Sequence, residues 1–365
     1  MGWYDSGWSY RKEVTIDNTS NSNNLIDYQV KVTLNSTNFD FSKAKSDGAD
    51  IRFTDDDGTT LLNHWIEKWD ASGEEAIIWV KVPSIPASSN RTIYLYYGNS
   101  NASSTSNGDD TFDFFDDFLG TSIDSNKWNT VNGGLSYSIT DGILRCNGSF
   151  QGSSSGDGGF AGWQSKTSFG LGRAIRGKIK VDHGQAGYYN KDEIGFGKRT
   201  YPVNTEFFVD VDQSSSNSNG VFSVGNGSSS SNTSWSRSTI YNIWDMIRYP
   251  SGNCRAIVGS VFDNTFTSNT PSGDLPVTIG RANWATDNVY YDFYIDWILV
   301  RKFSDPEPST TVGNEETNFC ISGQVTLNGN PVQGAIVRAI CQDDETYAGD
   351  TTTDENGNYS ITNLK

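Results

Sequence analysis

The segment from Val289 to Pro308, VYYDFYIDWILVRKFSDPEP, constrains the fold more than any other part of the chain. Successive side chains of an extended strand point to opposite faces, so alternate residues share a face. One face would be wholly apolar, with Val289, Tyr291, Phe293, Ile295, Trp297 and Leu299. Because Pro306 and Pro308 cannot continue a hydrogen-bonded ladder, we predict a long strand that closes a β-sandwich and ends a large domain.

The composition favours β structure along the whole chain. Aromatic residues make up 13% and Gly occurs 37 times, while Ser, Thr and Asn fill the polar positions. No stretch has helical periodicity for more than a turn or two. A chain of 365 residues has room for two or three domains, so we predict an all-β, multidomain protein.

The charge excludes two classes of partner. A net charge of −17 repels phosphate backbones and anionic lipid headgroups, so we expect no nucleic acid partner. No run of 18 apolar residues exists, which predicts no membrane insertion. The chain opens at Met1 without a signal-peptide pattern. We therefore expect either a removed leader or another export route, as in virion proteins, and a location outside the cell, on the cell surface or in a virion.

Strand-like runs and low-complexity segments divide the chain into three parts. We predict a first sandwich over residues 1–98 and a jelly-roll sandwich over residues 111–303, joined by a Ser/Asn-rich linker, 99–110, that has nothing to bury. A second linker, 304–318, precedes a small β module, 319–365. This last module is small for an independent sandwich, so we expect it to be incomplete or completed by a neighbouring subunit of a homo-oligomer.

Four motifs resemble a family of domains of unknown function found in archaeal and bacterial surface proteins and in some virus proteins. They are GWSYRKEVTI (7–16), DIRFTDDDGTTLLNHWIEKWD (50–70), WVKVPSIPASSNRTIYLYYGNSNA (79–102) and WILVRKFSDPEPS (297–309). The resemblance implies a surface protein and identifies no catalytic residues.

Two further segments resemble known modules. FFDDFLGTSIDSNKW (114–128) is similar to the start of a concanavalin A-like, laminin-G-like sandwich. The segments ISGQVTLNGNPVQGAIVRAI (321–340) and TDENGNYSI (353–361) are similar to carboxypeptidase-regulatory-like, prealbumin-type modules of Ig-like shape. Lectin-like sandwiches often bind calcium where their first and last strands meet, so the resemblance implies a calcium site at Asp116 or Asp117 together with Asp296.

Aromatic residues in loops are candidates for glycan binding. Gly/Ser/Asn-rich segments contain Trp163, Trp235 and Trp284, and another contains Tyr188 and Tyr189. Rings on loops of a rigid sandwich can stack on the apolar face of a sugar. Each such contact is weak, so attachment would need repeated copies. In the alternative interpretation, the tryptophans fill the ends of the sandwich.

The segment EFFVDVD is the best candidate for catalysis. Glu206, Asp210 and Asp212 would share one strand face with carboxylates about 7 Å apart, within the range that glycosidases use. Glu193, on a neighbouring predicted strand, is a further carboxylate. In the alternative interpretation, these acids form a solvated surface.

Four cysteines fall as one pair in each of two predicted domains. We predict Cys146 bonded to Cys254 and Cys320 bonded to Cys341, while other connectivities and free buried thiols remain alternatives. Neither a CxxC spacing nor a nearby His indicates zinc.

These patterns predict a non-enzymatic extracellular or virion-surface protein for attachment. Its central domain would bind glycans weakly and multivalently, and its partners would be glycans or surface proteins. Two alternatives remain: a structural subunit of a fibre, filament or viral tail, and a glycoside hydrolase.

Overall fold

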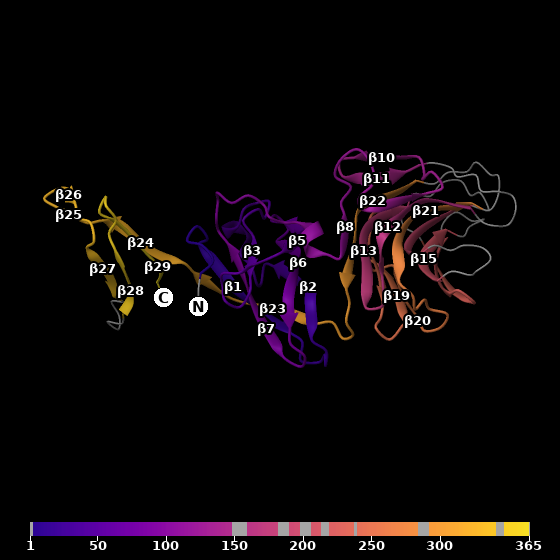
Figure 1. The fold of residues 1–365 in the computed structure, drawn as a ribbon, viewed down its shortest axis with the longest axis horizontal. Helices are drawn as coiled ribbons and strands as arrows, with labels where there is room; N and C mark the ends of the chain where they lie inside the picture. The colour runs from indigo at the N-terminus through magenta and orange to yellow at the C-terminus, as the bar shows by residue number, and fades with distance from the viewer. Residues whose placement is uncertain are drawn as a thin grey trace. The chain divides into compact units, whose positions relative to one another are not determined.

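The computed structural model describes residues 3–147, 159–181, 190–197, 206–212, 219–236, 239–283, 292–340 and 347–364. The chain is all-β, as the composition predicts (Figure 1). It divides into two compact units: unit 1 contains Met1–Thr111 and Pro308–Lys365, and unit 2 contains Phe112–Glu307. In the described residues, no helix has the length and apolar character needed to cross a membrane.

Unit 1 begins with a sandwich of two antiparallel sheets. One sheet has the order β23-β1-β7-β3-β4 and the other β2-β6-β5. Buried valine and isoleucine side chains from both sheets, such as Val14 and Ile78, form its core. The elements are β1 Tyr10–Asp17, β2 Leu25–Asn35, η1 Phe41–Lys43, β3 Arg52–Thr54, β4 Leu61–Leu62, β5 His64–Asp70, β6 Glu75–Ile85, β7 Asn90–Tyr97, α1 Gly108–Thr111 and β23 Ser309–Thr317.

The predicted linker 304–318 differs from the structure because β23 lies within it. This strand pairs antiparallel with β1, from Tyr10 opposite Thr317 to Asp17 opposite Ser309. Two consecutive glutamates anchor its end: Glu315 to Lys43 at 2.6 Å and Glu316 to Arg11 at 2.7 Å. Unit 2 is therefore an insertion between two strands of one sandwich. Pairing between segments so distant in sequence leaves no local signal.

The predicted linker 99–110 is also held against unit 1. Its backbone carbonyls accept hydrogen bonds from buried or half-buried cations, such as Arg52 to Ser103 O at 2.6 Å and Lys45 to Ala102 O at 2.8 Å. Further along, Asn107 N donates to His64 O at 2.9 Å. The segment has little to bury, as its composition indicates, but polar contacts of its backbone order it nonetheless.

His64 gives this sandwich a predictable dependence on pH. Its side chain is 2% exposed, and burial, with the nearby Arg52 charge as a second cause, lowers its pKa to about 4. The unfolded chain therefore binds a proton between about pH 6.5 and pH 4 that the folded chain does not, so stability is lost as the pH falls through this window. We expect a loss of about 3 kcal/mol from this group. Urea unfolding of wild type and His64→Phe at pH 7.5 and 4.5 measures it.

Only the difference between the two proteins tests this prediction, because carboxylates also titrate at acid pH. His64→Phe should lose less stability than wild type over this range. Equal losses in both proteins would contradict the assignment.

Unit 2 is a second antiparallel sandwich. In the described residues, one sheet has the order β10-β11-β22-β13-β18-β19-β20, with β8 also paired to β22, and the other has the order β17-β16-β15-β14-β21-β12-β9. We call them the eight-stranded and the seven-stranded sheet. Their strands are β8 Phe114–Asp116, β9 Trp128–Val131, β10 Tyr137–Thr140, β11 Ile143–Cys146, β12 Gly159–Phe169, β13 Arg173–Val181, β14 Asn190–Gly197, β15 Glu206–Asp212, β16 Asn219–Asn226, β17 Ser230–Ser236, β18 Asn242–Arg248, β19 Cys254–Val258, β20 Phe262–Phe266, β21 Leu275–Asn283 and β22 Phe293–Lys302.

Strand β22 is the strand predicted from residues 289–308, but the alternation of its side chains between the two faces shifts at one position. Opposite β13, Trp297 pairs with Lys178 but Ile295 already pairs with Ile179, so Asp296 is an extra residue. Such a bulge reverses the alternation. Phe293 and Ile295 enter the core before it, and Ile298 and Val300 after it, so the prediction that Trp297 and Leu299 share the core face was wrong.

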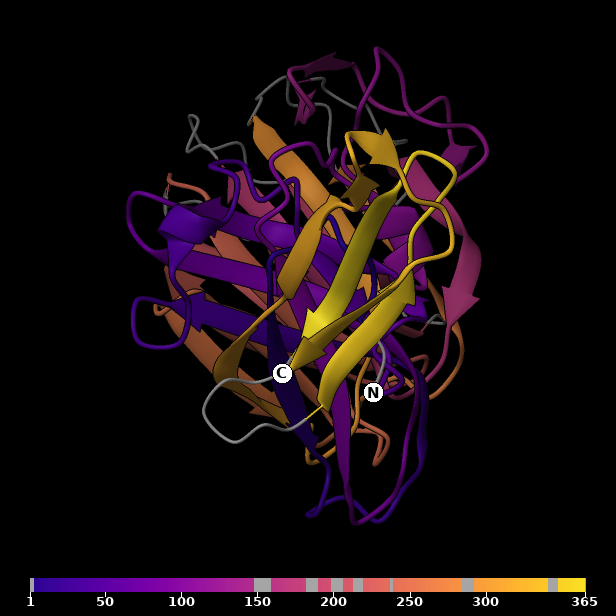
Figure 2. The same cartoon turned by 90° about the vertical axis from the view of Figure 1, so that its left-hand side faces the viewer.

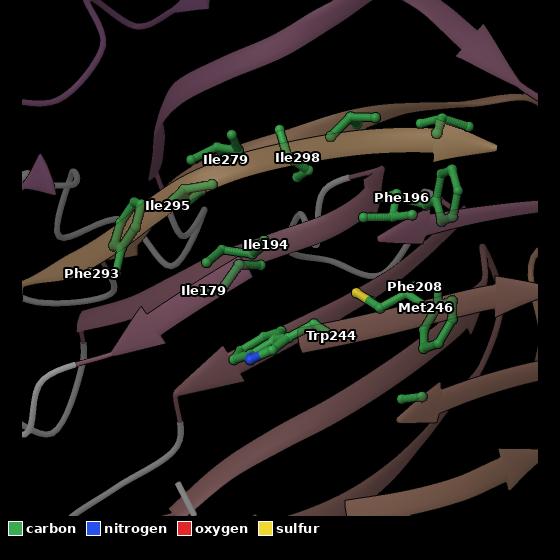
Figure 3. Close-up of a cluster of buried hydrophobic side chains, with 14 of the residues drawn as sticks. Ile179, Ile194, Phe196, Phe208, Trp244, Met246, Ile279, Phe293, Ile295 and Ile298 are labelled. Atoms are coloured by element: carbon green, nitrogen blue, oxygen red, sulfur yellow. The ribbon is translucent and has the colours of Figure 1, made fainter. Parts of the chain in front are cut away.

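The core of unit 2 lies between its two sheets. Figure 3 shows Ile194, Phe196 and Phe208 of the seven-stranded sheet and Trp244 and Met246 of the eight-stranded sheet among its side chains. All five are at most 2% exposed. This cluster defines the inner face of each sheet; we call the opposite side of the seven-stranded sheet its outer face.

The C-terminal module consists of small two-stranded sheets (Figure 2). Its strands are β24 Phe319–Gln324, β25 Thr326–Leu327, β26 Asn330–Pro331, β27 Ile336–Ile340, β28 Tyr347–Thr352 and β29 Asn358–Leu364. Four large apolar side chains of the module are 47–71% exposed: Ile321, Leu327, Ile336 and Ile340.

Candidate functional site

The candidate catalytic carboxylates of unit 2 lie on opposite faces of the seven-stranded sheet. Asp210 is paired with Ile194, which points into the core, so Asp210 also faces inward. Glu193 is the preceding residue on β14 and therefore lies on the outer face. Asp212 has its side chain outside the described part. Glu193 and Asp210 therefore do not form the pair that glycosidases need, because they cannot face one bond together.

Phe208 explains why the sequence pattern misled. It lies between Glu206 and Asp210 on the same strand face and is completely buried in the core. The acidic face of β15 is therefore the inner face, and the apolar Phe207 and Val209 form a separate small cluster on the outer face. Alternation gives the two faces of a strand but does not say which one another sheet will cover.

Glu206 and Arg248 instead both hydrogen-bond to the loop that contains Gly273. The carboxylate of Glu206 accepts a hydrogen bond from Gly273 N, while the guanidinium of Arg248 donates to Gly273 O at 2.6 Å. Arg248 also donates to Phe169 O at 2.7 Å and to Pro271 O at 3.3 Å. Burial lowers the pKa of Arg248. This side chain ties two loops of one sheet to the other sheet.

The tryptophans expected in loops belong to strands and to the core. Trp163 on β12 is 3% exposed and Trp235 on β17 is 6% exposed, and both belong to the main core cluster. The indole of Trp235 donates to Asp210 at 2.8 Å. The prediction that these two rings are available for stacking on a sugar was wrong, because their polar neighbours in sequence alternate with them on strands. Tyr188, Tyr189 and Trp284 lie outside the described residues.

The expected calcium ligands have other partners. Asp116 accepts hydrogen bonds from Trp128 Nε1 at 2.6 Å and from Phe118 N at 2.8 Å, and burial raises its pKa. Asp296 pairs with Lys178 at 2.5 Å. Across the described part of the chain, no three His, Cys, Asp or Glu side chains gather as a metal site would require. The two hydrogen bonds of Asp116 therefore help to position β8, the first strand of unit 2.

The predicted disulfide between Cys146 and Cys254 was wrong. Both thiols are free and buried. They lie on β11 and β19 of the same sheet, with β22, β13 and β18 between them, which separates them by about 19 Å. A disulfide needs Cα atoms within about 7 Å. Cys341 and the side chain of Cys320 lie outside the described part.

On the outer face of the seven-stranded sheet, two aromatic rings pack closely against glycines, and both are buried: Phe160 is 3% exposed and Phe207 is fully buried. A Cβ at Gly280 would come within 2.3 Å of the Phe160 ring, and one at Gly225 within 2.3 Å of the Phe207 ring. Glycine at these two positions therefore lets each ring lie against the backbone of the adjacent strand. No local sequence pattern predicts this arrangement, because the residues of each ring–glycine pair are far apart in the chain.

Polar groups lie among these rings. Gln164 donates to Thr278 Oγ1 at 3.2 Å, and Ser223 donates to Asn232 Oδ1. Strand alternation also places Glu193, which is 1% exposed, on this face. Gln164 is half-buried and Asn232 is exposed, so both can contact a ligand. We call these residues, with Phe160 and Phe207, the outer-face site.

Comparison with solved structures gives matches of low similarity. A β-glucanase of Bacillus licheniformis is 12% identical, with a TM-score of 0.39, and covers 52% of this chain and 97% of that chain. A lichenase from a mouse hindgut metagenome is 13% identical with a TM-score of 0.39, covering 52% and 99%. The carbohydrate recognition domain of Emp47p is 13% identical with a TM-score of 0.37, covering 52% and 93%.

Sequence comparison identifies one segment. The comparison with curated proteins gave no match. Residues 47–131, which run from the second half of the first sandwich through the ordered segment 99–110 to β9, match the model of a domain of unknown function, DUF2341.

Proposed function

We propose that this chain is a non-enzymatic attachment protein, displayed outside the cell or on a virion, whose unit 2 binds carbohydrate at the outer-face site. The observation that carries the proposal is the pair of accessible amide side chains on this sheet face, Gln164 and Asn232, each hydrogen-bonded to a hydroxyl beside it. A sugar presents a set of hydroxyls, and an amide group can both donate hydrogen bonds to them and accept hydrogen bonds from them.

The carboxylates support binding over hydrolysis. Glu206 holds Gly273, Asp210 holds Trp235, and Asp192 pairs with the buried Arg281 at 2.7 Å. A general acid and a nucleophile must face one bond from two sides. Each of these three carboxylates is instead hydrogen-bonded or ion-paired within the fold.

A glycan array tests the proposal with the full chain, biotinylated and tetramerised on streptavidin to raise avidity. Gln164→Ala and Asn232→Ala should each weaken binding to the best glycan about 3–10-fold, since each removes one hydrogen-bonding group. Thr265→Ala, an exposed position on the eight-stranded sheet, is the matched control and should bind as wild type.

Two results would contradict this proposal. An array without signal for the tetramer would exclude carbohydrate binding, and release of new reducing ends from a bound glycan would show an enzyme.

A second candidate function is assembly into a fibre or filament. The exposed Ile336 and Ile340 on β27 favour it, because apolar side chains this exposed mark an interaction surface. Sedimentation across a range of concentrations should then show self-association that Ile336→Asp reduces. A monomer at every concentration would leave attachment as the only proposed role.

A further inference from the structure

The first and last segments of unit 2 lie side by side. Strand β8 pairs antiparallel with the end of β22, with Phe114 opposite Val300 and Asp116 opposite Ile298. Just before β8, Asp113 N donates to Val300 O at 3.0 Å. We call this pairing the β8–β22 clasp. Through it, the folded unit 2 keeps its own two ends together.

Two ion pairs fix the outermost residues of unit 2 to its sheets. Arg173 on β13 contacts Asp113 at 2.7 Å, and Arg301 on β22, whose side chain is 5% exposed, contacts Glu307 at 2.5 Å. Asp113 is the second residue of unit 2 and Glu307 is its last. Almost no chain is therefore left free between the clasp and either end of the unit.

The adjoining residues of unit 1 are ordered as well. Thr111, its last residue before the insertion, accepts a hydrogen bond from Gln29 Nε2 at 3.0 Å. On the other side, Pro308 is followed at once by β23, which is paired with β1. Strand β23 is therefore a strand of the first sandwich that reaches its partner only through unit 2.

We infer that the β8–β22 clasp makes the docking of β23 on β1 depend on the folded state of unit 2. When unit 2 is folded, the clasp shortens the connection between β7 and β23 to a few residues beyond the ordered segment 99–111. When unit 2 is unfolded, roughly 200 residues of disordered chain join them. The probability of closing a loop falls as about the −3/2 power of its length, so docking weakens roughly 30–90-fold for an effective folded loop of about 10–20 residues.

This dependence reaches the C-terminal module. Strand β24 begins at Phe319, and only Asn318 separates it from β23. Asn318 N donates to Ser9 O at 2.8 Å, next to β1. Undocking β23 therefore removes the attachment that holds the start of the module to the first sandwich. The folded state of unit 2 thus controls where the module is attached, through the chain itself.

Hydrogen exchange measured by mass spectrometry on the full chain tests the inference. The Arg248→Met variant should unfold unit 2 at a urea concentration at which the first sandwich is still folded. Under that condition, peptides from β23 should lose protection roughly 30–90-fold, while peptides from β2 and β6 keep theirs. Unchanged protection of β23 after unit 2 has lost its own protection would overturn the inference.

Two further variants make the result interpretable. Glu316→Gln weakens the contact of β23 with Arg11 directly and should lower protection of β23 with unit 2 still folded, which shows that the peptide reports docking. If Arg248→Met does not fold, Trp235→Phe provides another destabilisation of unit 2, because it removes the bond to Asp210 and part of the ring volume in the core. Simultaneous loss of protection in β2, β6 and β23 with Arg248→Met or Trp235→Phe would also overturn the inference, since it would show general unfolding.

Discussion

Replacing Arg248 with methionine is expected to lower the free energy of unfolding of unit 2 by about 3–5 kcal/mol. The side chain is completely buried, and its guanidinium donates to carbonyls of both loops it joins, at Phe169 and Gly273. In the described residues no carboxylate forms an ion pair with it. Methionine fills a similar volume but leaves these carbonyls without a donor, and unsatisfied buried acceptors account for most of the expected loss.

Urea unfolding followed by tryptophan fluorescence measures the effect, with hydrogen exchange to assign it to unit 2. Arg255→Met is the matched control, because Arg255 on β19 forms an exposed ion pair with Asp263 on the neighbouring strand β20. Exposed pairs contribute about 0–1 kcal/mol, so the control should change little. Similar losses for both variants would show that Arg248 does not hold the loops as described.

Replacing Asp50 with alanine is expected to destabilise the first sandwich by about 3–4 kcal/mol. Asp50 is completely buried and accepts three backbone hydrogen bonds, from Lys45 N at 2.9 Å, Gly98 N at 2.7 Å and Asn99 N at 3.2 Å. The carboxylate thus joins the loop before β3 to the end of β7. Alanine leaves three backbone N–H groups, on the half-buried residues Lys45, Gly98 and Asn99, without this acceptor.

Asp47→Ala in the same loop is the control. Asp47 is exposed and accepts one hydrogen bond, from Ala49 N at 3.0 Å, so its loss should cost less than about 1 kcal/mol. Thermal unfolding monitored by circular dichroism and urea titration both distinguish the two variants. If Asp50→Ala were no more destabilising than Asp47→Ala, the carboxylate would not be the acceptor that joins these loops.

The fold class followed from local patterns. Alternating apolar residues, turn-forming Gly and Asn, and the absence of helical periodicity predicted an all-β chain, and the structure confirms it. The strand around Trp297 was predicted from the same alternation. Its phase was not, because the bulge at Asp296 depends on how β22 pairs with β13.

The candidate site was less predictable for a related reason. Glu206 and Asp210 do share one face of β15, as predicted. Phe208 lies on the same face and packs in the core, so this face is the inner one. The outer-face site depends on pairs such as Phe160 with Gly280, whose members are brought together only by the pairing of β12 with β21. The same holds for the two cysteines, which the sheet order separates.

By itself, the sequence determined that this chain forms sandwiches of antiparallel strands, because alternation and turn residues act over a few positions. Only the tertiary structure decided which face of each strand is covered, that β23 completes a sandwich begun 300 residues earlier, and that segment 99–110 is ordered. Those outcomes depend on contacts between segments that are distant in the chain. The free energy of such a contact depends on which strand pairs or packs with which, and no local sequence pattern specifies that partner.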